Sequence, residues 1–245
     1  MVVKQSGRLI AASLGPGDPG LITRAAWRAL EQAPCWAWPV GRRDGESYAL
    51  ALVQRTGLAQ PARTLPLDFP MTRDPVALAR HWQAAAQKTL AVLQEGVDVV
   101  FLVEGDASFF ATFGYLSQTV RSLDPAIRVT IIPGVSSPLA AAALEGEPLC
   151  AGEGTLAILP GTAGLERIGR VLDDFQTVVL LKVRPVLDAL LDLLDQRHLL
   201  QRTVFVERAG APEERVVRQV AALRGQSVHY LSLLIIHAGQ EDSSP

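Results

Sequence analysis

Apolar runs of strand length alternate along the chain with longer segments in which apolar residues recur every three or four positions. In the first part of the chain the runs predict strands over residues 8–14, 35–40, 63–67, 97–103 and 128–132. The longer segments predict helices over residues 19–33, with Asp18 as the cap, and over 47–54, 76–94 and 112–123. Ser136 or Ser137 can cap a further helix, with Pro138 just inside it. The run at 97–103 does not alternate, which is typical of a parallel strand covered on both faces. This order of elements predicts an α/β fold.

Residues 145–154, with the sequence EGEPLCAGEG, are rich in glycine and glutamate, as is typical of a linker between domains. Beyond them, runs at 155–159, 177–182, 203–207 and 230–236 predict strands, and 165–173 and 186–196 predict helices. Residues 216–223 form a further amphipathic element. We therefore predict an N-terminal α/β domain over 1–145, a linker over 146–154 and a C-terminal α/β domain over 155–245.

Composition narrows the classes of function. The chain has 245 residues, with 23 Lys and Arg against 25 Asp and Glu, so its formal net charge is −2. It therefore has no overall field for nucleic acid or an anionic membrane. Mean hydropathy is +0.21, yet no run of about 18 apolar residues predicts a membrane span, and the first residues lack the apolar core of a signal peptide. Two cysteines and four dispersed histidines predict neither a disulfide framework nor a metal site. We expect a cytoplasmic protein without a bound metal.

Residues 15–20, GPGDPG, match the G-x-G-x-x-G pattern of dinucleotide-binding turns. Three features disfavour that function. Asp18 places a carboxylate where phosphates need a positive helix end, and Pro16 and Pro19 each remove a backbone donor. The following strand, WAWPV at 36–40, also ends without an acidic residue for the ribose. A dinucleotide-binding protein that uses this turn is the alternative from a different class.

The turn at Glu104, Gly105 and Asp106 ends the most apolar run of the chain. Two carboxylates repel a phosphate but suit a ligand that carries ribose hydroxyls and positive charge. S-adenosylmethionine is such a ligand, because it has a sulfonium and an ammonium group. A strand-end turn with a capping aspartate is the other interpretation of the same residues.

Several motifs together resemble those of the tetrapyrrole methylases, the S-adenosylmethionine-dependent methyltransferases that modify uroporphyrinogen-derived macrocycles. The resemblance covers nearly the whole chain and rests on GPGDP at 15–19, GD at 105–106, PGVSS at 133–137, VERAG at 206–210 and YLSLL at 230–234. Within it, FPMTRD at 69–74 and EGDASFFATF at 104–113 resemble the branch that methylates C20 of precorrin-2 or cobalt-factor II. A sister methylase that acts at another ring position is the nearest alternative. A methylase of ribosomal RNA ribose would need a basic face, and the composition offers no excess of positive charge.

The resemblance implies a homodimer of two-domain chains, with a mostly parallel N-terminal sheet, a smaller mixed C-terminal sheet and a cofactor held between the domains. It implies S-adenosylmethionine as cofactor, S-adenosylhomocysteine as product and a tetrapyrrole as substrate. Carried over onto this sequence, it implies cofactor contacts at Pro16, Glu104, Gly105, Asp106, Phe109, Ser136, Ser137, Lys182 and Ala209. The chain departs from the family pattern at Ala107, where many members have proline, and at Lys182, where relatives often have an apolar residue.

Methyl transfer to carbon is an in-line displacement at a sulfonium, so alignment of the reactants supplies much of the catalysis. An electron-rich tetrapyrrole carbon needs no Ser or Cys nucleophile, but a base that removes the meso proton accelerates the reaction. Asp106 is the candidate base, and a contact to ribose or ammonium is its alternative role. The carboxylates of the substrate require local cations, for which arginine is well suited. The candidates are Arg42, Arg43, Arg73, Arg184 and Arg208.

Overall fold

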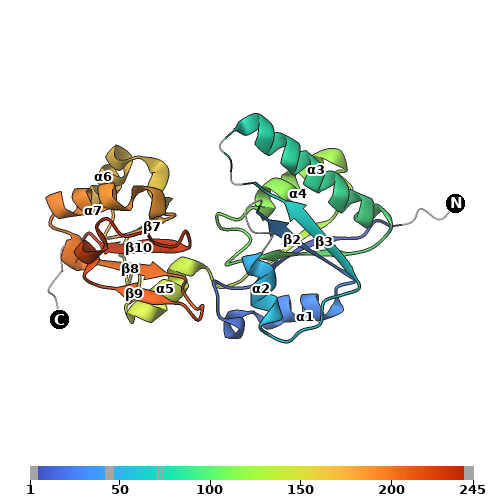
Figure 1. Cartoon of the computed structure of the whole chain (residues 1–245), viewed down its shortest axis with the longest axis horizontal. Coiled ribbons are helices and arrows are strands. Elements are labelled where there is room, and N and C mark those ends of the chain that lie inside the picture. Colours follow the sequence, from blue (N-terminus) through green and yellow to red (C-terminus); the bar gives the residue numbers. More distant parts are fainter. Residues whose placement is uncertain (1–4, 42–46, 71, 73, 240–245) are drawn as a thin grey trace. The chain divides into compact units, whose positions relative to one another are not determined.

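The structure is a computed structural model that describes residues 5–41, 47–70, 72 and 74–239 (Figure 1). The chain divides into two compact units between Ser136 and Ser137. Three of the arginines predicted to bind substrate, Arg42, Arg43 and Arg73, lie outside the described residues. Within the described ranges no helix combines the length and the apolar character needed to cross a membrane.

The first unit contains a parallel sheet with the strand order β3-β2-β4-β1-β5. Its strands are β1 (Leu9–Ser13), β2 (Cys35–Val40), β3 (Arg63–Asp68), β4 (Val99–Val103) and β5 (Val129–Ile132). Its helices are α1 (Arg24–Gln32), α2 (Tyr48–Gln54), α3 (Pro75–Gln94) and α4 (Phe113–Leu123). The predicted parallel sheet is confirmed, and β4 is its central strand.

Each face of this sheet has its own core, because side chains alternate between the two faces along a strand. Leu9 and Phe101 pack with residues of α3 and α4, whereas Ile10 and Leu102 pack with residues of α1 and α2. Figure 1 shows the two pairs of helices on opposite sides of the sheet. Burial on both faces explains why the residues of β4 are all apolar and do not alternate with polar ones.

The helix predicted over 19–33 is divided in the structure. Asp18 caps only one 3-10 turn, Pro19–Leu21, by accepting a hydrogen bond from the Gly20 N–H at 2.7 Å. The helix α1 begins later, at Arg24, where the Thr23 hydroxyl accepts from the Ala26 N–H at 3.2 Å. Two capping residues close together in the sequence therefore start two separate elements.

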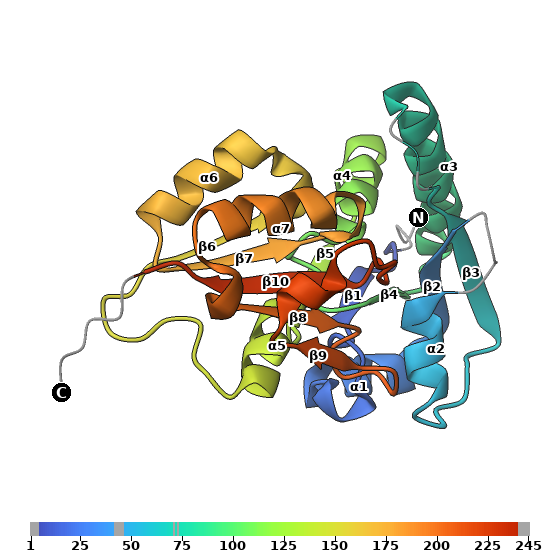
Figure 2. The same ribbon diagram turned by 60° about the vertical axis from the view of Figure 1, so that its left-hand side comes forward.

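The second unit contains a mixed sheet with the order β6-β7-β10-β8-β9. Its strands are β6 (Leu156–Pro160), β7 (Thr177–Leu181), β8 (Thr203–Glu207), β9 (Arg215–Val217) and β10 (Ser232–His237). The strands β6 and β7 are parallel, whereas β10 is antiparallel to β7 and β8. Figure 2 shows α6 (Leu165–Asp174) and α7 (Leu187–Gln196) on one face of the sheet, where they cover a core that includes Phe205 and Leu234. The mixed C-terminal sheet is confirmed.

Two details of the predicted organisation differ from the structure. We assigned residues 137–145 to the N-terminal domain, but the helix they form, α5 (Ser137–Glu145), groups with the second unit. One reason is a contact at its end, where His237 Nε2 of β10 lies 3.0 Å from Glu145 Oε1. The second difference concerns residues 216–223, which are divided between β9 and a 3-10 turn, Val220–Leu223.

Candidate functional site

The glycine turns after β1, β4 and β5 meet at one edge of the first sheet, because these parallel strands are neighbours and their carboxyl ends lie side by side. The first two turns are joined directly. The Gly105 N–H donates to the Gly15 carbonyl at 2.8 Å, and the Gly15 N–H donates to the Gly105 carbonyl at 3.2 Å. Both glycines are left-handed, with φ of +77° and +71°, which a side chain would strain. This edge is where open parallel sheets bind their ligands.

Asp106 ties the turn after β4 to the turn after β5. Its Oδ2 accepts a hydrogen bond from the Gly134 N–H at 2.7 Å, and its Oδ1 accepts from the Ser108 N–H at 2.8 Å and from the Ser108 hydroxyl. Burial alone would raise the pKa of Asp106, but these hydrogen bonds hold it below its ordinary value. The carboxylate is therefore ionised and anchored, which favours a positioning role over the predicted role as a base.

Ser13 makes a second link between the turns, which was not predicted from the sequence. Its fully buried hydroxyl accepts a hydrogen bond from the Ala107 N–H at 2.9 Å. The turn after β5 packs closely on this serine, since a Cβ added at Gly134 would lie 2.6 Å from the Ser13 Cβ and 3.0 Å from the Gly105 oxygen. The signal in the sequence is a serine at the end of an apolar strand, two residues before Gly15.

Glu104 directly follows β4 and is partly buried. Among the described residues, its carboxyl group has neither a hydrogen-bond partner nor an ion pair. Burial raises the pKa of Glu104 to about 8. In the free protein this carboxyl group is therefore mostly protonated at neutral pH, in contrast to Asp106.

Three further predicted cofactor contacts belong to the first unit. Pro16 is buried directly after Gly15, and Phe109 is connected to the anchored turn because its N–H donates to the Asp106 carbonyl at 3.1 Å. Ser136 is partly buried just beyond the turn after β5. The sheet edge thus brings Pro16 close to the turn after β4, because Gly15 and Gly105 are paired.

The turn at 15–20 does not have the geometry of a diphosphate site. The Gly15 N–H already donates to Gly105, and the Gly20 N–H already donates to Asp18. The helix α1 begins only at Arg24, so its N-terminus does not follow the glycines directly. These contacts disfavour the dinucleotide alternative.

The second unit brings Arg184 and Arg208 together. They follow β7 and β8, which run in the same direction because β10 is antiparallel to both. The two arginines line a hollow of about 440 Å³ whose other residues are Glu207, Glu213, Ser227, Val228 and His229. Arg208 Nη1 lies 3.3 Å from a carboxylate oxygen of Glu213, so part of its charge is already paired.

His229 belongs to the same hollow, although no pattern in the sequence places it there. Its Nδ1 accepts a hydrogen bond from the Leu231 N–H at 3.2 Å, so the neutral ring carries its proton on Nε2. Burial, and then the charge of Arg208, lowers its pKa. Of the remaining predicted residues, Ser137 begins α5, Lys182 follows β7 with a φ of +56°, and Ala209 is buried after β8.

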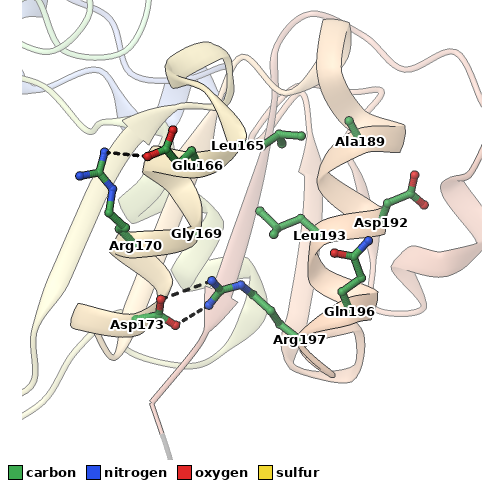
Figure 3. A pocket seen from close by; sticks show the side chains of 10 residues that line it. All are labelled: Leu165, Glu166, Gly169, Arg170, Asp173, Ala189, Asp192, Leu193, Gln196 and Arg197. Atoms are coloured by element: carbon green, nitrogen blue, oxygen red, sulfur yellow. Dashed lines mark hydrogen bonds and ion pairs between the residues drawn. The ribbon is translucent and has the colours of Figure 1, made fainter.

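A larger hollow of about 520 Å³ lies between α6 and α7 (Figure 3), and none of the predicted site residues lines it. Its charged side chains are already paired: Arg197 binds Asp173, Arg170 lies 3.9 Å from Glu166, and Asp192 binds Arg224, which lies outside the hollow. We therefore assign it no ligand. In the part of the chain that the structure describes, no group of three or more His, Cys, Asp or Glu residues could hold a metal ion.

A parallel α/β unit followed by a mixed α/β unit, with paired glycine turns at the strand ends, defines a two-unit α/β protein with a candidate ligand site at the carboxyl edge of the first sheet. The family described as Tetrapyrrole (Corrin/Porphyrin) Methylases matches residues 8–223, and the chain belongs to this family. The predicted family, and with it the predicted methyltransferase class, is confirmed.

Relatives and solved structures agree with this assignment. The chain is 31% identical to the cobalt-precorrin-2 C(20)-methyltransferase of Salmonella typhimurium, over 95% of this chain and 97% of that protein. It is also 31% identical to the precorrin-2 C(20)-methyltransferase of a Sinorhizobium species, over 94% of this chain and 95% of that protein. The uroporphyrin-III C-methyl transferase of Thermus thermophilus, solved with S-adenyl homocysteine, has the same fold, with a TM-score of 0.64 and 24% identity over 95% of this chain and 98% of that chain.

Proposed function

We propose that the protein methylates C20 of precorrin-2, or of its cobalt-containing counterpart, in the biosynthesis of the corrin ring of cobalamin. The observation that carries this proposal is the similarity, over nearly the full length of both chains, to two proteins named as C20-methyltransferases of these macrocycles. The motifs at 69–74 and 104–113 support the same branch. The resemblance to the family further leads us to propose a cytoplasmic homodimer.

We propose S-adenosylmethionine as the methyl donor, and the residues at the sheet edge fit it. The donor is cationic, and Glu104 offers a carboxyl group without a partner among the described residues. The residues proposed to hold it are Pro16, Glu104, Gly105, Asp106, Phe109 and Ser136 of the first unit, and Ser137, Lys182 and Ala209 of the second. When bound, the donor supplies an electrophilic methyl group on sulfur.

The chain's own residues act mainly by positioning. Asp106 and Ser13 fix the turns, so the groups that face the donor and the tetrapyrrole are held in place before either binds. Well-oriented reactants gain roughly 7–11 kcal/mol from positioning alone. The reacting carbon is itself nucleophilic, so the mechanism requires no covalent intermediate with a Ser or Cys side chain.

Arg184 and Arg208 are proposed to bind substrate carboxylates, and their shared hollow supports this role. Arg42, Arg43 and Arg73 are proposed to do the same from outside the described residues. Because Arg208 is partly neutralised by Glu213, we expect Arg184→Ala to raise the KM for the tetrapyrrole more than Arg208→Ala does.

The test is incubation with precorrin-2 and S-adenosylmethionine labelled in its methyl carbon, followed by location of the label by mass spectrometry and NMR. Label at C20 is expected. Label at another ring position would replace the proposal with that of a sister methylase, and no transfer to any tetrapyrrole would overturn it. Thermal unfolding adds a check on the donor: S-adenosylhomocysteine at about 100 times its Kd should stabilise the protein by roughly 2.7 kcal/mol, and NAD should have no effect.

A further inference from the structure

Glu104 and Asp106 are two residues apart but differ in their hydrogen-bond partners and in the direction in which their pKa values are shifted. Asp106 receives three hydrogen bonds and is ionised. Glu104 receives none from the described residues. A carboxylate that is partly buried and has no partner is costly to ionise, and burial is the cause that raises its pKa to about 8. A carboxyl group at this position does not stabilise the fold, so stability does not explain its presence.

The backbone holds Glu104 in a defined place. The residue before it ends the central strand of the sheet, and the residue after it, Gly105, is paired with Gly15 on both its N–H and its carbonyl. Leu102, two residues earlier, packs in the core on the side of α1 and α2, and the alternation of β4 directs Glu104 toward the same side. Glu104 therefore lies at the carboxyl edge of the sheet, on backbone that is fixed on both sides.

We propose that Glu104 is the catalytic residue that accepts the proton leaving C20, and that the positive charge of the methyl donor controls its ionisation. This inference rests on the proposed function. In the reaction, an electron pair of the macrocycle forms the bond from C20 to the methyl carbon, and the pair of the broken carbon–sulfur bond stays on sulfur. The C20–H bond then breaks, its electron pair returns to the macrocycle, and the proton binds the Glu104 carboxylate.

The positive charge of the donor determines when Glu104 is ionised. A positive charge within about 4–6 Å lowers the pKa of a carboxyl group by roughly 1 to 3. A donor bound at the edge would therefore bring Glu104 from a pKa of about 8 to between about 5 and 7, so that it is ionised at neutral pH. Methyl transfer removes the sulfonium charge, and the pKa of Glu104 rises again in the step in which C20 must lose its proton. Asp106, whose carboxylate is held by backbone donors, cannot respond in this way.

Proton release on donor binding tests the proposal without turnover. Titration calorimetry at pH 7, in buffers of different ionisation enthalpy, counts the protons released when S-adenosylmethionine binds. A pKa that falls from about 8 to between about 5 and 7 predicts release of about 0.4 to 0.9 proton, with a clearly smaller release for S-adenosylhomocysteine, which lacks the sulfonium. Glu104→Gln should abolish the difference between the two ligands. Glu147→Gln, at an exposed position, serves as the matched control and should retain it.

Turnover tests the catalytic role. Glu104→Gln is nearly isosteric with the protonated carboxyl group, so the fold should persist, while kcat falls roughly 10²–10⁴-fold. A substrate deuterated at C20 should react more slowly than the protonated one in the wild type. A Glu104→Gln enzyme with wild-type kcat, or equal proton release by both ligands in the wild type, would overturn the role of Glu104 and leave the proposed function intact. If the wild type does not methylate C20, the proposed function fails, and the base assigned to that carbon fails with it.

Discussion

Replacing Asp106 by alanine removes the link between the turns after β4 and β5. The carboxylate accepts hydrogen bonds from the N–H groups of Gly134 and Ser108 and from the Ser108 hydroxyl. Ser108 is exposed, so water can take over its two donors, whereas Gly134 is partly buried and packs against Ser13. A hydrogen bond to a charged group contributes roughly 1.5–3 kcal/mol. With the Gly134 bond counted in full and the Ser108 bonds only in part, Asp106→Ala should lower the free energy of unfolding by about 2–4 kcal/mol.

Chemical denaturation of the wild type and the variant measures this difference. Asp106→Asn keeps one oxygen as an acceptor, so it should lose about half as much stability as Asp106→Ala. Asp124→Ala is the matched control: Asp124 accepts one exposed hydrogen bond, from the Ala126 N–H at 3.0 Å, and its loss should cost less than about 1 kcal/mol.

The stability difference between the wild type and Asp106→Ala should also depend on pH. The folded pKa of Asp106 lies below its ordinary value of 3.8, so its contribution to stability is present above that pH and is lost as the pH falls through the folded pKa. The gap between the wild type and Asp106→Ala should therefore narrow in acid. A loss below about 0.5 kcal/mol at pH 7, or a gap that widens in acid, would refute the anchoring role of Asp106.

Three other predictions each concern a feature within one of the two units. Gly134→Ala should lower the apparent unfolding temperature, because its Cβ would lie 2.6 Å from the Ser13 Cβ, whereas Gly114→Ala in α4 meets nothing within 4 Å and should not; differential scanning calorimetry of both variants decides this. Burial raises the pKa of Glu104 from 4.5 to about 8, so the free energy of unfolding of the wild type should decline as the pH rises between these values, by no more than about 5 kcal/mol. The decline should be absent in Glu104→Gln. A free energy of unfolding that does not change with pH in the wild type would contradict the burial of this carboxyl group. His237→Ala leaves the Glu145 carboxyl group, 7% exposed, without its partner at 3.0 Å, and should destabilise the second unit by about 1–3 kcal/mol in denaturation, whereas no change would show that water replaces the histidine.

Local sequence signals predicted most of the secondary structure. The strands at 35–40 and 203–207 appear with the predicted bounds, because each is an apolar run with clear turn residues after it. The run at 97–103 begins as a strand only at Val99. Asp98 stays outside it, where its carboxylate accepts a hydrogen bond from the Arg8 N–H at 2.7 Å and binds the Arg8 guanidinium. An ion pair between residues so distant in the sequence leaves no local pattern.

The site shows the same limit more strongly. The sequence shows glycine turns after three of the predicted strands, but their meeting at one edge depends on the strand order β4-β1-β5, which only the structure gives. The bonds that define the roles of the side chains, such as Ser13 to Ala107 and Asp106 to Gly134, join residues from different strands and depend on packing. For that reason the sequence suggested Asp106 as a base, whereas the contrast with Glu104 emerges only from the partners that one carboxyl group has and the other lacks.

The pairing of Gly15 with Gly105 has a consequence for how ligand recognition can evolve in this chain. The pairing holds the two turns in one backbone conformation before a ligand binds. Little chain entropy is therefore lost on binding. Changes in selectivity are then expected to arise from neighbouring side chains such as Ser108 and Phe109, because a side chain at Gly15 or Gly105 would strain the paired backbone.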